Sequence, residues 1–199
     1  AFSRYGSVPV AEMQHAGTFA EASAAMGNQI YAPVDMVPEG GVVHAGEHDM
    51  IPAMPEEVIL ETIEKYGDAA AFLKRCGFGM VLIHGGHGWL LSQWMSPSIN
   101  KRKDQWGGEK LENRMRLPLA IIDNIRKKCG RNFPIEFRMS GDECTPDGYD
   151  FEEGKRIAQM LDGKVNLIHV STGHHENRDA FTRRSEERRV GKECRSRWS

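Results

Sequence analysis

Residues 77–113 read GFGMVLIHGGHGWLLSQWMSPSINKRKDQWGGEKLEN, and the apolar run Met80–Ile83 within them decides the fold class. Four apolar residues in succession, with glycine before them and His84 after them, are typical of a strand that is buried on both faces. Strands of this kind belong to parallel sheets whose two faces are covered. We therefore expect an α/β protein.

The same alternation of strands and helices extends over the rest of the chain. Besides residues 80–83, we predict short strands over Val8–Met13, Pro134–Met139 and Val165–Val170, and helices over 55–76, Leu111–Lys128 and Phe151–Leu161. Residues 18–54 are rich in Gly, Pro, Ala and Met, which predicts a long functional loop such as a lid over a cofactor. Strands that alternate with helices indicate a parallel sheet.

The ends of the predicted strands separate two kinds of parallel sheet. An open dinucleotide-binding sheet carries GxGxxG in its first strand-to-helix turn, and no predicted strand here is followed by that fingerprint. The strand ends carry polar, titratable side chains instead, namely His15, His84, His87, Arg138, His174 and His175. Because the loops converge on one site at the carboxyl ends of barrel strands, this pattern predicts part of a (β/α)8 TIM barrel.

Composition excludes several classes of protein. With 40% hydrophobic and 27% charged residues, the chain has the balance of a water-soluble globular protein. No run of about 18 apolar residues is present, so we predict no membrane segment. The opening AFSRYGSVPV has no signal-peptide pattern and reads as an interior cut. Cys76, Cys129, Cys144 and Cys194 stand singly, without metal-ligand spacing, which predicts thiols in a reducing cytoplasm and no metal site.

Residues 183–199, RRSEERRVGKECRSRWS, differ sharply from the rest of the chain. They hold seven Lys or Arg and three Glu, a net charge of +4, which leaves 19 basic and 25 acidic residues, or −6, in residues 1–182. A basic tail can bind nucleic acid or anionic lipid, but this one lacks periodicity and resembles a translated sequencing adapter. We interpret it as an unstructured sequencing or cloning artefact, and the acidic body predicts no nucleic-acid partner.

Residues 77–116 carry a set of short motifs: HGxHG beside LLxQ, then SPxxNxRxDxxGG and ENRxR, in this order. Together they resemble the Old Yellow Enzyme family, whose members are FMN-dependent (β/α)8 barrels that take hydride from NAD(P)H and reduce activated C=C bonds. The resemblance implies that residues 1–182 form an incomplete FMN-dependent oxidoreductase domain with roughly strands 3 to 6 of the barrel. It also implies FMN as the cofactor, NAD(P)H as the reductant and a small unsaturated molecule as the substrate.

His84 and His87 lie three residues apart, just after a buried strand, so both imidazoles can project from one turn into the same cavity. Two donors in such a place suit a carbonyl oxygen that gains negative charge. The resemblance assigns both histidines to substrate binding and catalysis. The alternative is a structural role, in which they cap a helix or pack in the turn.

Two further residues are candidates for contact with the flavin. Arg138 lies within a predicted strand, where an internal charge needs an anionic partner. The resemblance places it against the pyrimidine side of FMN, and the alternative is a buried ion pair with Glu136 or Asp142. Glu12 stands where the family has glutamine in QLxHAG, since this chain reads EMQHAG. The resemblance implies that Glu12 contacts the edge of the flavin ring.

The usual proton donor of the family is missing. Trp89 replaces the tyrosine of HGYLL at this substrate-binding position, and its indole N–H is no acid near neutral pH. Residues 171–177 resemble the TGxxWHE segment of bacterial 2,4-dienoyl-CoA reductases, which makes His175 the candidate donor. The alternative is an exposed loop histidine. Ser98 replaces the arginine that this branch uses for its thioester, so the chain is closer to the bile-acid and enoate oxidoreductases.

The sequence therefore predicts a cytoplasmic FMN enzyme of the ene-reductase type. By resemblance to the larger enoate and bile-acid enzymes, a 4Fe–4S cluster and FAD would belong to a C-terminal part beyond this chain. Two other interpretations stay open: a flavin-dependent dehydrogenase of amines or steroids on the same scaffold, and an inactive structural fragment. With four strands and two open sheet edges, we expect this chain alone to aggregate and to bind FMN weakly.

Overall fold

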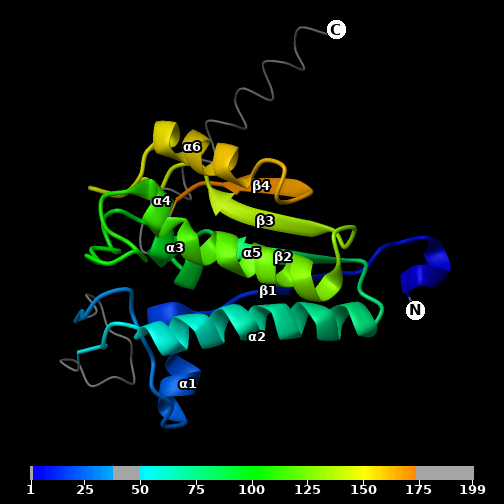
Figure 1. Ribbon diagram of the computed structural model, residues 1–199, viewed down its shortest axis with the longest axis horizontal. Helices are drawn as coiled ribbons and strands as arrows, with labels where there is room; N and C mark the ends of the chain where they lie inside the picture. The colour runs from blue at the N-terminus through cyan, green and yellow to red at the C-terminus, as the bar shows by residue number, and fades with distance from the viewer. Residues whose placement is uncertain (1, 38–49, 174–199) are drawn as a thin grey trace, which may run out of the picture.

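The computed structural model describes residues 2–37 and 50–173, which form one parallel sheet with helices packed on it (Figure 1). The strands are β1 Val10–Met13, β2 Met80–Gly85, β3 Ile135–Ser140 and β4 Leu167–Ser171, hydrogen-bonded in the order β1-β2-β3-β4. All neighbouring pairs are parallel. The predicted parallel sheet is confirmed, and each predicted strand end lies within two residues of the observed one.

A helix follows each of the first three strands: α2 Glu56–Arg75 after β1, α5 Arg116–Cys129 after β2 and α6 Phe151–Leu161 after β3. In Figure 1, α5 lies in front of β2, and α2 runs beside α5, below β1 in this view. Acidic residues in the first turn of α2 and basic residues in its last turn favour the helix through its dipole. At the start of α6, Asp150 caps the helix by accepting from the backbone N–H of Glu153 at 3.0 Å.

The core lies between the sheet and these helices. Alternate residues of β2 and β3 turn towards the helices and are buried, namely Val81, Ile83, Ile135, Phe137 and Met139. They form one cluster with apolar residues of α2 and α5, including Ile59, Ile63, Leu117, Ile121, Ile122 and Ile125. Because successive strand residues point to opposite faces of a sheet, the residues of β2 and β3 that alternate with these line its other face.

The structure differs from the prediction of one helix over residues 111–128. That segment contains two helices, α4 Leu111–Arg114 and then α5, which meet at Met115. Pro118 has no N–H to donate to the carbonyl oxygen of Arg114, so an unbroken helix would lack that hydrogen bond. Proline is tolerated in the first turn of a helix, and the first turn of α5 is where it lies.

The sequence pattern does not predict several short helical segments. Helix α3, Leu90–Met95, is buried along its whole length, so it has no polar face to reveal its period. Within the predicted loop of residues 18–54, the chain forms the 3-10 turn η2, Gly17–Phe19, and the short helix α1, Glu21–Ala25. Another 3-10 turn, η1, spans Phe2–Tyr5.

Strands β1 and β4 are the two edges of the sheet, and neither has a further strand partner among the described residues. Val10 on β1 is exposed, as are Leu167 and Val170 on β4. A closed eight-stranded barrel would cover both edges with further strands. The observed sheet therefore corresponds to half of the strands of such a barrel.

Candidate active site

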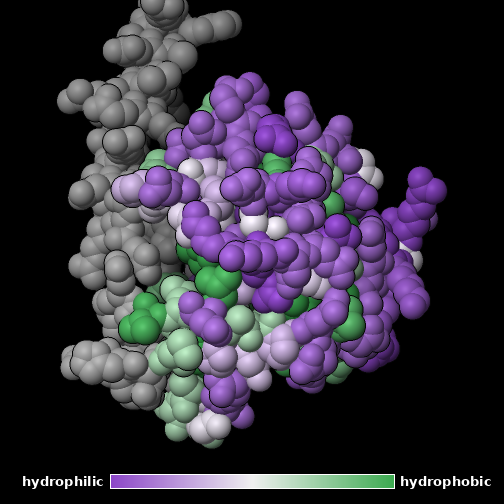
Figure 2. Space-filling view, turned by 60° about the vertical axis from the view of Figure 1, so that its left-hand side comes forward, coloured by the Kyte–Doolittle hydropathy of each residue, from purple (hydrophilic) through white to green (hydrophobic). Residues whose placement is uncertain are grey.

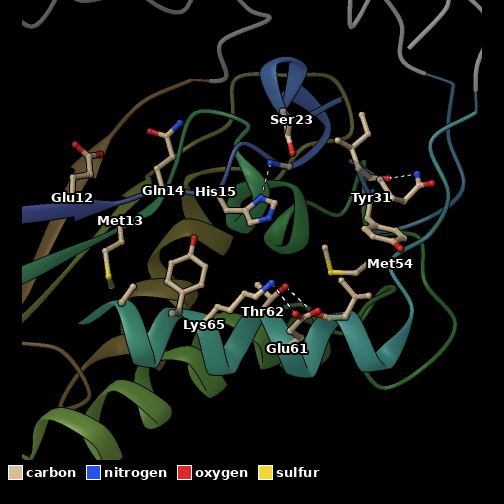
Figure 3. A pocket seen from close by; sticks show the side chains of 17 residues that line it. Glu12, Met13, Gln14, His15, Ser23, Tyr31, Met54, Glu61, Thr62 and Lys65 are labelled. Atoms are coloured by element: carbon tan, nitrogen blue, oxygen red, sulfur yellow. Dashed lines mark hydrogen bonds and ion pairs between the residues drawn. The ribbon is translucent and has the colours of Figure 1, made fainter. Parts of the chain in front are cut away.

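The face of the sheet away from α2 and α5, here called the inner face, carries polar side chains. The register places His84 of β2 beside Arg138 of β3, and Arg138 beside His169 of β4. Glu12 of β1 and Glu136 of β3 lie two residues nearer to the amino ends of the strands. Figure 3 shows Glu12 on the side of β1 that faces away from α2. Five titratable groups thus share one face.

Glu12, His84 and His87 form a continuous chain of hydrogen bonds. Oε1 of Glu12 contacts Nδ1 of His84, and Nε2 of His84 lies 3.2 Å from Nδ1 of His87. The His84 side chain is 5% exposed and the Glu12 side chain 44% exposed. Both ring nitrogens of His84 are therefore engaged within the protein. The two predicted histidines come together, with their rings joined by this contact, and their roles in substrate binding and catalysis stay predictions.

The backbone after β2 fixes the position of His87. Its φ is 60°, in the left-handed region. Its N–H donates to Oγ of Ser140 at 3.3 Å, and that hydroxyl donates to the carbonyl oxygen of Gly173 at 3.0 Å. Gly85 is required because a Cβ there would lie 2.5 Å from the Phe137 ring. The glycine-rich loop after β2 is thereby tied to the ends of β3 and β4.

Arg138 is half-buried on the inner face, and its Nε donates to Oγ of Ser171 at 2.9 Å. The structure forms neither of the alternative ion pairs considered for it. Glu136 pairs with Nδ1 of His169 at 3.1 Å, and Asp142 accepts a backbone N–H of its own loop at 2.6 Å. Among the described residues, no carboxylate oxygen lies within 4 Å of the Arg138 guanidinium. Its charge is therefore available to another anionic or electron-rich group.

Two predicted site residues remain, Trp89 and His175. Trp89 is half-buried just before α3, and its ring packs edge-on against Phe19 of η2 with the centroids 5.9 Å apart. His175 lies outside the described residues, which end at Gly173. Its role as a proton donor stays a prediction.

A buried carboxyl group near the carboxyl end of β3 has no signal in the sequence. Glu143 is 1% exposed, and its Oε2 accepts from Oγ of Ser96 at 2.8 Å and from the backbone N–H of Tyr149 at 3.1 Å. Since Ser96 gives its proton to Glu143, Ser98 is the donor in the 2.7 Å contact between the two serine hydroxyls. Burial raises the pKa of Glu143 to about 7, against the lowering effect of the Ser96 hydrogen bond.

Gln93, the glutamine of the LLxQ motif, has a structural role. Its side chain is buried and donates to Oγ1 of Thr18 at 2.9 Å and to the carbonyl oxygen of Gly88 at 2.8 Å. A Cβ at Gly17 would lie 2.6 Å from its Oε1, which explains glycine at that position. Gln93 thus joins the loop after β1 to the loop after β2.

A cavity of about 600 Å³ lies beside the site, between β1, η2, α1 and α2 (Figure 3). Of the predicted site residues within the described part of the chain, Glu12 is the one that lines it. Burial lowers the pKa of His15 on its wall, and the charge of Lys65 adds to this effect. Nδ1 of His15 accepts from the N–H of Gly17 at 3.0 Å. Figure 2 shows hydrophobic residues gathered low on the molecule, at the level of α1, below a largely hydrophilic surface.

Membrane spans and metal sites were both expected to be absent. Within residues 2–37 and 50–173, no helix has the length and apolar character needed to cross a membrane. Over the same ranges, no three His, Cys, Asp or Glu side chains are arranged so that they could hold a metal ion.

Consecutive parallel strands, their helices and a polar inner face define part of a (β/α)8 barrel with a candidate active site at its carboxyl end. A sequence model of the NADH:flavin oxidoreductase / NADH oxidase family matches residues 1–199, and the chain belongs to this family. The resemblance to Old Yellow Enzyme-like NADH:flavin oxidoreductases is thereby confirmed. FMN as the cofactor and NAD(P)H as the reductant are confirmed at the level of the family.

Three similar proteins show how much of each whole protein this chain represents. It is 46% identical over 120 residues to the NADH oxidase of Thermoanaerobacter brockii, covering 60% of this chain and 18% of that protein. It is 38% identical over 117 residues to the N,N-dimethylglycine/sarcosine dehydrogenase of Chromohalobacter salexigens, covering 58% and 17%. The solved complex of 2-naphthoyl-CoA reductase with 2-naphthoyl-CoA superposes with a TM-score of 0.78 at 26% identity, over 87% of this chain and 27% of that chain. The partial barrel is thus confirmed, and the chain spans less than a third of these three proteins.

Proposed function

We propose that this chain is the central part of the flavin domain of an FMN-dependent NAD(P)H oxidoreductase of the ene-reductase type. The enzyme would transfer hydride to an α,β-unsaturated carbonyl or enoyl substrate. The observation that carries the proposal is the hydrogen-bonded chain Glu12–His84–His87 beside an Arg138 guanidinium without a carboxylate partner in the described part. Donors and a cation at one end of a barrel suit a reaction in which negative charge develops on a substrate oxygen and on a cofactor ring.

The residues of the inner face fit FMN. A half-buried guanidinium without an anionic partner is costly unless a ligand compensates it, and the electron-rich pyrimidine side of a flavin would do so at Arg138. The second carboxylate oxygen of Glu12 can accept a hydrogen bond from the edge of the ring. When bound, FMN supplies the chemistry of accepting and donating hydride. Arg138 would stabilise negative charge on the ring, and Glu12 would orient it.

The substrate would be held and protonated by groups of the neighbouring loops. His84 and His87 would hold its activating oxygen as a pair: His87 would contact the oxygen, and His84 would act through its hydrogen bond to His87. Trp89 would line the same place. Because an indole N–H cannot serve as a general acid near neutral pH, we assign protonation of the α-carbon to His175. Histidine is suited to proton transfer in this pH range.

A second candidate function is the dehydrogenation of an amine on the same scaffold. Trp89 favours it, because oxidation of a C–N bond needs no proton on a carbon and loses nothing when the tyrosine is absent. The similarity to the N,N-dimethylglycine/sarcosine dehydrogenase supports the same class. Introducing tyrosine at Trp89 separates the two, since it should accelerate enone reduction and leave amine oxidation unimproved.

Further proposals concern the protein around this chain. Residues 1–182 would be an incomplete domain that further strands complete, and residues 183–199 an artefactual tail. A 4Fe–4S cluster and FAD would lie in another part of a longer cytoplasmic protein. The chain alone would then bind FMN weakly and convert little substrate. If it has no activity at all, it is the inactive structural fragment considered above.

The test is an anaerobic assay of a longer protein that contains residues 1–182, with NADH and panels of enones, enoyl-CoA thioesters and amines. We expect at least one unsaturated compound to be reduced and to change the flavin spectrum on binding. The double variant His84→Ala/His87→Ala should lose that spectral change, and His169→Asn, in a separate pair with Glu136, should keep it. Turnover of amines alone supports the second candidate. An unaltered spectral change in the double variant supports the inactive fragment.

A further inference from the structure

We infer that Glu12 is a positioning residue, whose carboxylate fixes the proton of His84 on Nδ1 and so sets the direction of the hydrogen bond between His84 and His87. Its use in catalysis rests on the proposed function. The contacts that carry it lie entirely within this chain.

The first step concerns the contact between Glu12 and His84. An ionised carboxylate only accepts hydrogen bonds, so the atom of His84 that faces Glu12, Nδ1, must carry a hydrogen. A neutral imidazole has one N–H, which leaves Nε2 of His84 as an acceptor. The burial of His84 excludes water as a competing partner that could reverse this arrangement.

The second step concerns the contact between the two rings. Nε2 of His84 lies 3.2 Å from Nδ1 of His87. Because Nε2 of His84 is the acceptor, Nδ1 of His87 must donate, and a neutral His87 then has no hydrogen on its own Nε2. Both hydrogen bonds of the array point towards Glu12. In this state His87 can accept a hydrogen bond at Nε2 but cannot donate one there.

Donation from His87 to a substrate oxygen therefore requires one added proton. With that proton, taken from solvent, His84 carries hydrogen on both nitrogens and donates through Nε2 to Nδ1 of His87, whose hydrogen is now on Nε2. No electrons move in this step. The added positive charge lies on His84, in contact with the Glu12 carboxylate, and such charge-assisted contacts are the strong ones. A glutamine in place of Glu12 would accept from His84 equally but would not balance the charge.

The chain offers a matched control in a second carboxylate–histidine pair. Glu136 contacts Nδ1 of His169 on the same inner face, at 3.1 Å. The side chain of His169 is 44% exposed, so water competes for its ring, in contrast to His84. Changes at Glu136 should therefore affect His169 and leave His84 as it is.

Ring 15N–1H correlation spectra of the histidine-labelled longer protein, prepared without flavin or substrate, test the tautomer. We expect His84 to carry hydrogen on Nδ1 in the wild type and in Glu12→Gln, to lose this preference in Glu12→Ala, and to keep it in Glu136→Ala. His87→Phe should also keep it, which provides a test if Glu12→Ala fails to fold. Hydrogen on Nε2 alone in the wild type, or in His87→Phe, would overturn the inference whatever the enzyme's activity.

Calorimetry of cyclohex-2-enone binding to the FMN-loaded longer protein tests the second step. Titrations in two buffers with different ionisation enthalpies report the protons taken up. We expect an uptake of about one proton in the wild type and in Glu136→Gln, and a smaller uptake with weaker binding in Glu12→Gln. Binding without proton uptake in the wild type would contradict the direction assigned to the array. Absence of binding together with the expected Nδ1 tautomer would instead count against the proposed function alone.

Discussion

Replacing Glu143 with glutamine removes a carboxyl group that folding buries near the carboxyl end of β3. Its Oε2 accepts hydrogen bonds from Ser96 and Tyr149, whereas Oε1 is buried without a partner in the described part of the chain. Burial therefore favours the protonated form and raises the pKa from 4.5 to about 7. At about 1.4 kcal/mol per pH unit, this stabilises the folded chain by about 3 kcal/mol below pH 4.5, and the stabilisation is lost as the pH rises through 7.

Glutamine keeps an acceptor for both donors but cannot ionise, so Glu143→Gln should lack this pH dependence. Urea unfolding between about pH 4.5 and about pH 8.5 measures it. We expect the free energy of unfolding of the wild type to fall by about 3 kcal/mol relative to the variant over this range. Glu109→Gln, at an exposed position, should follow the wild type. Parallel curves for the wild type and Glu143→Gln would refute the reasoning, because they would mean that the folded chain ionises Glu143 at no cost.

Three further changes test the flavin site, the core and the sheet edge. Arg138→Met should weaken FMN binding by about 10- to 100-fold, the equivalent of one hydrogen bond to a charged group. Flavin fluorescence titration of the longer protein measures the affinity, and an unchanged value would contradict the placement of FMN. Gly85→Ala would bring a Cβ to 2.5 Å from the Phe137 ring and should cost about 1–3 kcal/mol in thermal unfolding, part of which Phe137→Leu should restore if this clash is the cause. Val170→Lys, on the exposed edge strand β4, should reduce light scattering by concentrated protein more than Val37→Lys, an exposed position outside the sheet. Equal effects of the two substitutions would show that the chains do not associate through this edge.

Periodicity predicts the elements in which a pattern repeats over several turns. Helix α6 spans the residues predicted for it. Helix α2 begins directly after Pro55 and ends at Arg75, so each of its ends lies one residue inside the predicted range of 55–76. The prediction fails where a local feature competes with the pattern. Pro118 breaks the hydrogen-bond ladder of the helix predicted over 111–128, and α3 is too short and too fully buried to show a period.

The candidate site could be predicted in its residue types but not in its connections. The motifs identify His84 and His87, yet the contact of His84 with Glu12 joins residues 72 apart in the sequence. It depends on the register of β1 against β2, which no local pattern encodes. Glu143 escapes prediction for another reason. Its burial depends on how the loop after β3 packs against Ser96, and in the sequence it is one acid in a polar stretch.

One hydrogen-bonded unit at the carboxyl ends of β2 and β3 joins the two networks described above. Ser140 accepts from the backbone of His87 through its hydroxyl and from the Tyr149 hydroxyl through its carbonyl, and the backbone N–H of Tyr149 donates to Glu143. This unit positions the histidines in the same way whether the enzyme reduces an enone or oxidises an amine. Under the proposed function, the choice between these two reactions would therefore be made outside this unit, where a proton is or is not delivered to carbon. By its resemblance to the family, Trp89 stands where the proton-donating tyrosine is expected, so under the proposed function the side chain at this position, and not the histidine pair, is the informative one to vary.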